Sequence, residues 1–242
     1  MRGRSDLGHN GSMTAPAAEP VTIAVDDATR VSGLLQLPSR AQACYVVAHG
    51  AGAGMQHPFM SSVATDLAAR GIGTLRYQFP YMEKRSKRPD PPAVCHATVR
   101  AAVAEAARHA SALIAGGKSF GGRMTSQAQA ATPLAGVQGL AFLGFPLHPP
   151  GKPSDARAEH LSAVRIPLLF LQGTRDEFAQ LTLLQPLLER LGSRATLKLF
   201  QDADHSFHVP ARSGPTDAQI RGAMLDALAA WTESILGATR KS

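Results

Sequence analysis

Short apolar runs rich in β-branched residues alternate with amphipathic helical patterns along almost the whole chain. This alternation is typical of an α/β fold, in which a mostly parallel central sheet carries helices on both faces. The run CYVVA is apolar throughout, as expected for a strand that is buried on both sides. The sequence predicts strands at residues 21–25, 31–37, 44–48, 72–77, 112–115, 137–143, 166–171 and 195–200. We expect the first two to be antiparallel, because an Asp-Asp turn joins them.

Three segments between or after these strands carry apolar residues at helical spacing. Residues 59–67 have an apolar side chain at every fourth position, and Gly71 is expected to end that helix. Residues 99–110 and 220–235 each have one apolar face, and Gly237 is expected to close the later helix. We interpret these faces as surfaces that pack in the core.

The length of 242 residues fits one domain with a single core. We expect that domain to span residues 13–242. Residues 1–12 are interpreted as the remnant of an expression tag, because Gly11-Ser12 directly precedes Met13. The N-terminal arginines are not followed by an apolar run, so a secretory signal is not expected. No run reaches the about 18 apolar residues of a membrane span, so we expect no membrane partner.

Cys44 and Cys95 are the only cysteines, and they do not form a CxxC pair. Two separated thiols do not make a disulfide framework. We therefore expect reduced cysteines and a cytoplasmic protein.

The motif Gly117-Lys118-Ser119-Phe120-Gly121 follows a predicted strand and precedes a predicted helix at residues 121–131. A GxSxG sequence in this setting is typical of a nucleophile elbow, a sharp turn that lifts a serine out of the sheet. Small residues two positions before and after the serine avoid clashes at the turn. The sequence therefore predicts Ser119 as a nucleophile, with a plain glycine turn as the alternative.

The glycine-rich segment HGAGAG, residues 49–54, directly follows the strand CYVVA. Glycines allow the backbone to approach a substrate closely. An oxyanion hole takes one N–H from the residue after the nucleophile and another from such an earlier loop. We expect Phe120 and Ala51 to be these donors. A phosphate-binding loop is the alternative, although the Lys-Ser/Thr ending of a P-loop is missing.

An acid and a base should follow the serine in the order Ser, Asp/Glu, His. Asp176 and His205 each lie in the segment that follows a predicted strand, at the carboxyl end where active sites of parallel sheets assemble. The sequence predicts His205 as the base and Asp176 as the acid that orients it. Glu177 is the alternative acid and His208 the alternative base.

Three other polar side chains near these motifs are expected to be structural. Asp202 and Asp204 should shape the loop before the histidine, and His49 should brace the glycine-rich loop.

The connection at residues 145–153 contains four prolines, which prevent a continuous helix. We therefore expect no sizeable lid domain and an open active site. His57, Phe145 and His148 are expected at the rim of the pocket as substrate-binding residues.

The net charge is +7, and the densest basic run is Lys84, Arg85, Lys87 and Arg88. Prolines follow this run, so it is interpreted as a solvated loop, with contact to an anionic partner as the alternative. It lacks the aromatic interleaving and the motifs of nucleic-acid-binding proteins, so nucleic acid is not an expected partner. No cluster of His, Cys, Asp or Glu suggests a metal, and no cofactor is expected.

Six segments together resemble a known family: HGAGAGM, LRYQFPYMEK, GGKSFGGRM, FPLHPPGKP, LQGTRDEF and DADHSF. They are similar to the small bacterial α/β-hydrolases related to dienelactone hydrolase, in a branch that is largely uncharacterised. The resemblance implies the α/β-hydrolase fold, with Ser119, Asp176 and His205 as the triad and Ala51 and Phe120 as oxyanion donors. Dienelactone hydrolase itself uses a cysteine nucleophile, so its substrate does not carry over to this serine.

The function expected from these residues is hydrolysis of small carboxylic esters through an acyl-enzyme. The alternatives are a thioesterase or other acyl hydrolase with the same triad, and a non-catalytic interaction module on a hydrolase fold. The sequence leaves the oligomeric state open.

Overall fold

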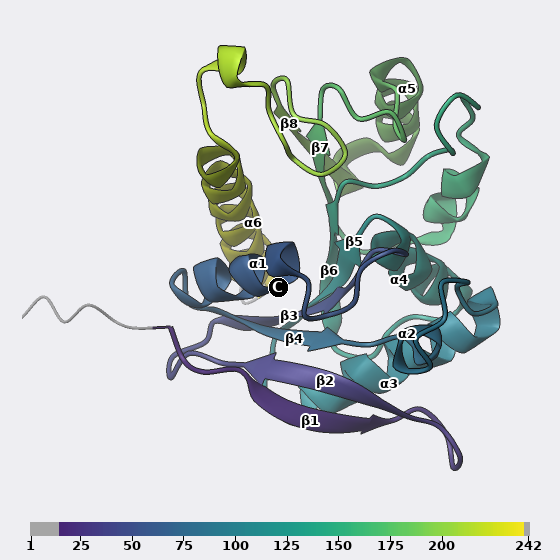
Figure 1. The fold of residues 1–242 in the computed structure, drawn as a ribbon, viewed down its shortest axis with the longest axis vertical. Helices are drawn as coiled ribbons and strands as arrows, with labels where there is room; N and C mark the ends of the chain where they lie inside the picture. Colours follow the sequence, from purple (N-terminus) through teal and green to yellow (C-terminus); the bar gives the residue numbers. More distant parts are fainter. Residues whose placement is uncertain (1–14, 240–242) are drawn as a thin grey trace, which may run out of the picture.

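The computed structural model describes residues 15–239. They form a central sheet with helices packed around it (Figure 1). In this range the sheet has eight strands in the order β1-β2-β4-β3-β5-β6-β7-β8. The pairs β1–β2 and β2–β4 are antiparallel, and the other neighbours are parallel. The strands are β1 (Glu19–Ala24), β2 (Arg30–Gln36), β3 (Ala43–Ala48), β4 (Ile72–Tyr77), β5 (Leu113–Lys118), β6 (Val137–Leu143), β7 (Leu168–Gly173) and β8 (Ala195–Phe200).

Helices cover both faces of the sheet, so the expected fold class is confirmed (Figure 1). They are α1 (Pro58–Ala68), α2 (Pro80–Glu83), α3 (Pro92–Ala107), α4 (Phe120–Ala131), α5 (Leu181–Leu191) and α6 (Asp217–Thr239). Short 3₁₀ turns occur at η1 (Ala156–Ala163), η2 (Gly192–Arg194) and η3 (Ala211–Ser213). The apolar side chains of α1 and α6 pack on one face, and those of α3, α4 and α5 pack on the other.

Strand β3 shows why the central strands are apolar throughout. All of its residues are buried. Cys44 and Val46 point into the core under α3 and α4, whereas Tyr45 and Val47 point into the core under α1. Successive side chains of a strand face opposite sides. A strand between two helical layers therefore has no position for a solvated side chain.

Three helices differ from the sequence expectations. Helices α2 and α5 are not among the predicted helices, and α5 forms although Pro186 lies inside it, because its buried Leu184, Leu187 and Leu191 anchor it to the core. Helix α6 continues past Gly237, so the prediction that this glycine closes the helix is wrong. A glycine inside a helix lowers stability but breaks no hydrogen bond, so the helix need not end there.

The connection from β6 to β7 contains only η1, and residues 15–239 include no large lid. None of the described helices is long and apolar enough to cross a bilayer. The expected tag remnant, residues 1–12, lies outside the described residues.

Candidate active site

Ser119 occupies a strained turn between β5 and α4. Its backbone angles are φ 51° and ψ −116°, a conformation that costs a non-glycine residue on the order of 1–3 kcal/mol. Space around the turn is tight, because a Cβ added at Gly121 would lie 2.7 Å from the Cβ of Ala48. The close packing explains the small residue at this position of GxSxG. The turn places the hydroxyl of Ser119 at the carboxyl end of the sheet.

The structure brings Ser119, His205 and Asp176 into one hydrogen-bonded chain. Nε2 of His205 lies 2.7 Å from Oγ of Ser119, and Nδ1 of His205 lies 2.7 Å from Oδ2 of Asp176. A carboxylate only accepts hydrogen bonds, so Nδ1 carries the proton and Nε2 is free to accept one from the serine. This tautomer is the one that a general base requires.

The carboxylate of Asp176 is held by further donors that the sequence analysis missed. Its side chain is completely buried. Oδ1 accepts a hydrogen bond of 2.8 Å from the backbone N–H of Phe178, and Oδ2 accepts another from Nε2 of Gln172. The amide oxygen of Gln172 accepts the N–H of Phe145 at 2.9 Å, which fixes the orientation of the amide. These bonds orient the acid before any substrate binds.

The alternative acid and base lie outside this chain of hydrogen bonds. Glu177 is exposed. His208 is also exposed and pairs with Asp217 at 2.8 Å. Asp204 accepts hydrogen bonds from the backbone N–H groups of Ser206 and His208, so it shapes the histidine loop. Within the described residues, Asp176 is therefore the carboxylate that is bonded to His205.

His49 braces the glycine-rich loop. Its Nδ1 donates to the carbonyl of Gly50 at 2.8 Å, and its Nε2 accepts the backbone N–H of Phe79 at 3.1 Å. Burial lowers the pKa of His49 to about 4, which keeps the ring neutral. A neutral ring can hold both partners, because one nitrogen donates and the other accepts.

The expected oxyanion donors lie on either side of the serine turn. Ala51 lines the same pocket as Ser119, and its carbonyl accepts a 2.9 Å hydrogen bond from the hydroxyl of Tyr81. Phe120 is the first residue of α4, and N–H groups in the first turn of a helix have no acceptor within the helix. The side chain of Phe120 packs edge-on against Phe79, away from the pocket. Phe120 thus follows Ser119 directly in the chain, and Ala51 shares a pocket with it.

Lys118, directly before the nucleophile, is a polar group of the pocket to which the sequence analysis assigned no role. Its Nζ donates a hydrogen bond of 2.6 Å to the backbone carbonyl of His205. Burial lowers the pKa of Lys118 to about 8, although the charges of Asp176 and Asp204 oppose this shift. The ammonium thus links the nucleophile strand to the loop that carries the base.

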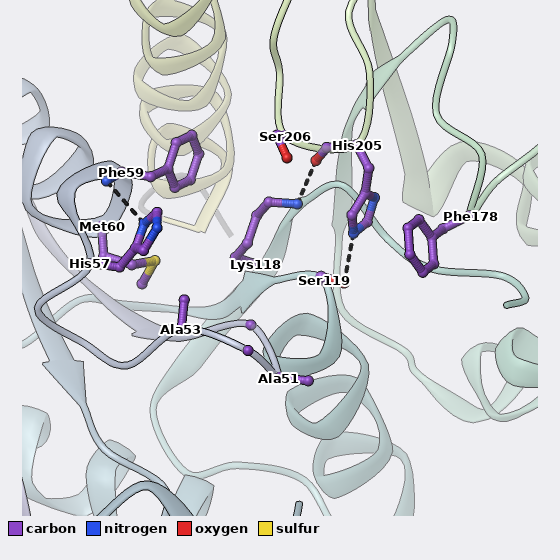
Figure 2. Close-up of a pocket in the computed structure, with 12 residues that line it drawn as sticks. Ala51, Ala53, His57, Phe59, Met60, Lys118, Ser119, Phe178, His205 and Ser206 are labelled. Atoms are coloured by element: carbon purple, nitrogen blue, oxygen red, sulfur yellow. Dashed lines mark hydrogen bonds between the residues drawn. The ribbon is translucent and has the colours of Figure 1, made fainter. Parts of the chain in front are cut away.

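The triad opens into a pocket of about 420 Å³ (Figure 2). Figure 2 shows His57, Phe59 and Met60 on one side of this pocket, with Ser119 and His205 across from them. Phe178 lies against the ring of His205, with 4.2 Å between the ring centroids. The lining residues are Gly50, Ala51, Gly52, Ala53, His57, Phe59, Met60, Lys118, Ser119, Phe178, His205 and Ser206.

Of the three expected rim residues, the structure places only His57 at the pocket. The prediction for Phe145 and His148 is wrong, because both side chains are buried elsewhere. Phe145 packs on Phe142 with 5.0 Å between ring centroids. Nε2 of His148 accepts the backbone N–H of Gln180 at 3.4 Å. The proline-rich connection turns its larger side chains into the core, so it contributes no wall to the pocket.

Two sequence signals could have revealed the missed residues. Gln172 is a polar residue inside the otherwise apolar strand LLFLQG, and a buried amide requires hydrogen-bond partners. The second signal is that Phe59 and Met60 come shortly after the glycine-rich loop, in the first turn of α1. No sequence pattern indicated that Phe178 would reach the ring of His205. Among residues 15–239 no group of three or more His, Cys, Asp or Glu is arranged to hold a metal.

Known proteins share both the sequence pattern and the fold. Residues 41–233 match the family model described as an α/β hydrolase domain. A dienelactone hydrolase from Anabaena variabilis superposes with a TM-score of 0.72 at 21% identity, covering 91% of this chain and 98% of that chain. A serine hydrolase without a lid from Xanthomonas campestris gives a TM-score of 0.69 at 23% identity, covering 89% and 95%.

An esterase domain of a Rhodothermus marinus protein has a TM-score of 0.65 at 17% identity, covering 88% of this chain and 97% of that chain. At these identities the solved structures show that the fold is shared. The family model covers most of the chain, and the architecture around Ser119 agrees with it. The chain therefore belongs to the α/β-hydrolase family, and it is similar to dienelactone hydrolase and its lidless relatives.

Proposed function

We propose that the protein hydrolyses small carboxylic esters through an acyl-enzyme on Ser119. The observation that carries this proposal is the pair of 2.7 Å hydrogen bonds that joins Ser119 to His205 and His205 to Asp176. A scaffold protein would have no need for a serine in a strained backbone conformation beside a correctly protonated histidine. Solved relatives that are called esterases and serine hydrolases support the same reaction class.

The reaction begins when Oγ of Ser119 attacks the carbonyl carbon of the ester and its proton passes to Nε2 of His205. Asp176 stabilises the imidazolium that forms. The carbonyl oxygen becomes an oxyanion, which the N–H groups of Ala51 and Phe120 would stabilise. Imidazolium then gives its proton to the departing alcohol, and the acyl group stays on Ser119.

Water releases the acid in the second half of the reaction. His205 takes a proton from the water as it attacks the acyl carbonyl, and later returns that proton to Oγ of Ser119. The pocket of about 420 Å³ is open to solvent beside the triad, so water reaches the acyl-enzyme without a conformational change.

A small acyl compound is the partner that this pocket fits, because its volume lies at the low end of the range for ligand sites.

Both cysteines are free and buried. Reduced thiols are usual in the cytoplasm, which is the compartment that we propose. Fractionation of cells that express the natural chain tests this proposal, and recovery of the protein in a secreted fraction would contradict it.

A fluorophosphonate probe tests the nucleophile directly, because it labels only activated serines. We expect one label on the wild-type protein and none on Ser119→Ala. Ser206→Ala is the matched control, since Ser206 lines the same pocket but lies outside the triad. This control should label like the wild type. An unlabelled, folded wild-type protein would overturn the proposal and favour a non-catalytic module.

Turnover assays then separate ester from thioester hydrolysis. Acetate esters and acetate thioesters of matched leaving groups are compared by kcat/KM on the same preparation. We expect the ester to be the better substrate, and a preference for the thioester of more than about tenfold would reassign the reaction class.

A further inference from the structure

A second pocket, of about 450 Å³, adjoins the active-site pocket and is lined by a basic segment. We call it the basic pocket. The two pockets share Ala51 and Gly52, the backbone that borders Ser119. A Cβ added at Gly52 would meet nothing within 4 Å, so this shared border is open. The lining residues of the basic pocket are Ala51, Gly52, Met82, Arg85, Ser86 and Lys87.

The positive charges of this segment are not neutralised by neighbouring acids. In the described part of the chain, no ion pair or side-chain hydrogen bond engages Lys84, Arg85, Lys87 or the guanidinium of Arg88. All four residues are exposed. The segment therefore carries four exposed positive charges, and two of them, those of Arg85 and Lys87, line the basic pocket.

The two nearest carboxylates in the sequence are already engaged by backbone groups. Oε1 of Glu83 accepts the N–H of Ser32 at 2.6 Å. Oδ2 of Asp90 accepts the N–H of Tyr81 at 2.7 Å. These two acids fix the position of the basic segment instead of pairing with its charges.

The segment is tied to the glycine-rich loop through Tyr81. The hydroxyl of Tyr81 donates to the carbonyl of Ala51, while its own carbonyl accepts the N–H of Ser86 at 2.8 Å. Arg85 has a positive φ of 54°, held by a 3.0 Å hydrogen bond from its N–H to the carbonyl of Met82. A defined turn, not a free loop, therefore presents Arg85 and Lys87 next to the site of reaction.

We propose that the basic pocket binds a negatively charged group of the substrate, a carboxylate or a phosphate, while the ester bond lies at Ser119. This inference rests on the proposed ester hydrolysis and names the class of substrate that the site prefers. Arg85 supplies a planar fork for a carboxylate or phosphate, and Lys87 supplies a second positive charge. The shared border at Ala51 and Gly52 lets one small molecule occupy both pockets.

The anionic group can belong to the acyl part or to the alcohol part of the ester, and matched substrates distinguish these sources. Para-acetoxybenzoate carries the charge on the leaving group, and para-acetoxybenzamide is its neutral counterpart. The para-nitrophenyl monoester of glutaric acid carries the charge on the acyl part, and para-nitrophenyl pentanoate is its neutral counterpart. For each pair, kcat/KM is measured at low ionic strength.

We expect one charged substrate to exceed its neutral counterpart by about fivefold or more, mainly through KM. The double variant Arg85→Gln, Lys87→Gln should bring this ratio close to one and leave the rates with the neutral substrates unchanged. Lys198→Gln is the matched control, because Lys198 is an exposed cation on β8. The ratio should also fall with added salt, since exposed charges are screened within about 10 Å at 0.1 M.

The inference is overturned if charged and neutral substrates are turned over equally, or if the preference survives in the double variant. A binding measurement separates this failure from a failure of the proposed function. Calorimetry on Ser119→Ala with para-hydroxybenzoate and with glutarate, the anionic products of the two charged substrates, measures binding without turnover. Binding of either anion that is lost in Arg85→Gln, Lys87→Gln supports the basic pocket even if the protein hydrolyses no ester, and absence of binding of both at millimolar concentration contradicts it.

Discussion

The ammonium of Lys118 donates a 2.6 Å hydrogen bond to the backbone carbonyl of His205, so the residue before the proposed nucleophile holds the loop that carries the proposed base. The bond joins the end of β5 to the loop after β8, two segments far apart in the sequence. This bond is separate from the side-chain hydrogen bonds that join Ser119, His205 and Asp176. It fixes the backbone of His205 and so the position of the imidazole. Lys118 is therefore a positioning residue in the proposed reaction.

The rate should depend on the charge of Lys118. Burial lowers the pKa of Lys118 to about 8, so its ammonium is charged below this pH and becomes a neutral amine above it. A charged donor makes a stronger hydrogen bond than a neutral one, by about 1 kcal/mol. We expect kcat to fall by about fivefold as the pH rises through 8. The measurement is kcat against pH with a neutral ester.

Lys118→Met separates this effect from other causes of an alkaline limb. The variant keeps the length of the side chain but has no charge to lose, so its kcat should be lower and flat across the same pH range. If Lys118→Met shows the same alkaline limb as the wild type, Lys118 does not set it.

Removal of either member of the Ser–His pair should abolish most turnover. Ser119→Ala and His205→Ala are each expected to lower kcat by about 10³-fold or more, and the double variant should be scarcely worse than either single variant. His208→Ala is the matched control, because His208 is exposed and bonded to Asp217. Single-turnover and steady-state rates on a small ester provide the measurement, and near-wild-type turnover by Ser119→Ala would refute the assignment.

Gln172 should contribute to both stability and rate. Gln172→Leu removes a donor to Asp176 and leaves the buried N–H of Phe145 without its acceptor. An unpaired buried group costs about 1–3 kcal/mol, so the free energy of unfolding should fall by that amount. We expect kcat to fall as well, because Asp176 loses part of its orientation.

Urea denaturation and ester hydrolysis measure these two effects. Gln201→Leu is the control, since Gln201 is exposed and bonded only to the neighbouring Asp202. An unchanged urea midpoint in Gln172→Leu would show that the buried amide has no structural role.

The size of the pocket limits the acyl chain. Phe59 and Met60 form its apolar side, next to His57, within a volume of about 420 Å³. Each methylene that is buried contributes about 0.8 kcal/mol, and each that stays in water contributes nothing. For para-nitrophenyl esters below their micelle threshold, kcat/KM should therefore rise over the shortest chains and then level off. A steady rise to long chains would contradict this prediction.

A substitution in the pocket tests which side chain limits the length of the acyl chain. Phe59→Ala enlarges the apolar side and should move the preferred chain length upward by a few carbons. Val94→Ala, an exposed apolar truncation, should leave the chain-length profile unchanged.

The central strands β3, β4 and β7 could be predicted from the sequence because all their residues are buried between two helical layers, and they are mostly apolar for that reason. The order Ser119, Asp176, His205 could also be predicted, since each residue lies at or shortly after the carboxyl end of a strand and these ends meet at one edge of a parallel sheet. The partners of Asp176 could not, because Gln172 reaches it through side-chain geometry that no spacing rule specifies.

The positions of the Phe145 and His148 side chains could not be predicted from the sequence. Prolines correctly indicated an irregular connection, but they do not reveal which way it folds. Packing of Phe145 against Phe142 and Phe170 decides that direction, and these contacts join different strands. Helix α5 was not predicted either, and in it the burial of leucines outweighs the local cost of Pro186.

The strand order has a consequence for how specificity can change in such a protein. The nucleophile, the acid, the base and the glycine-rich loop follow β5, β7, β8 and β3, and the basic segment follows β4 by way of α2. The chemistry and the basic pocket thus share one edge of the sheet, while the two cores lie beneath it. Exchanges of the exposed Arg85 and Lys87 would change the charge of the basic pocket without removing a core contact. Substrate preference can therefore change in evolution while the core continues to support the same fold.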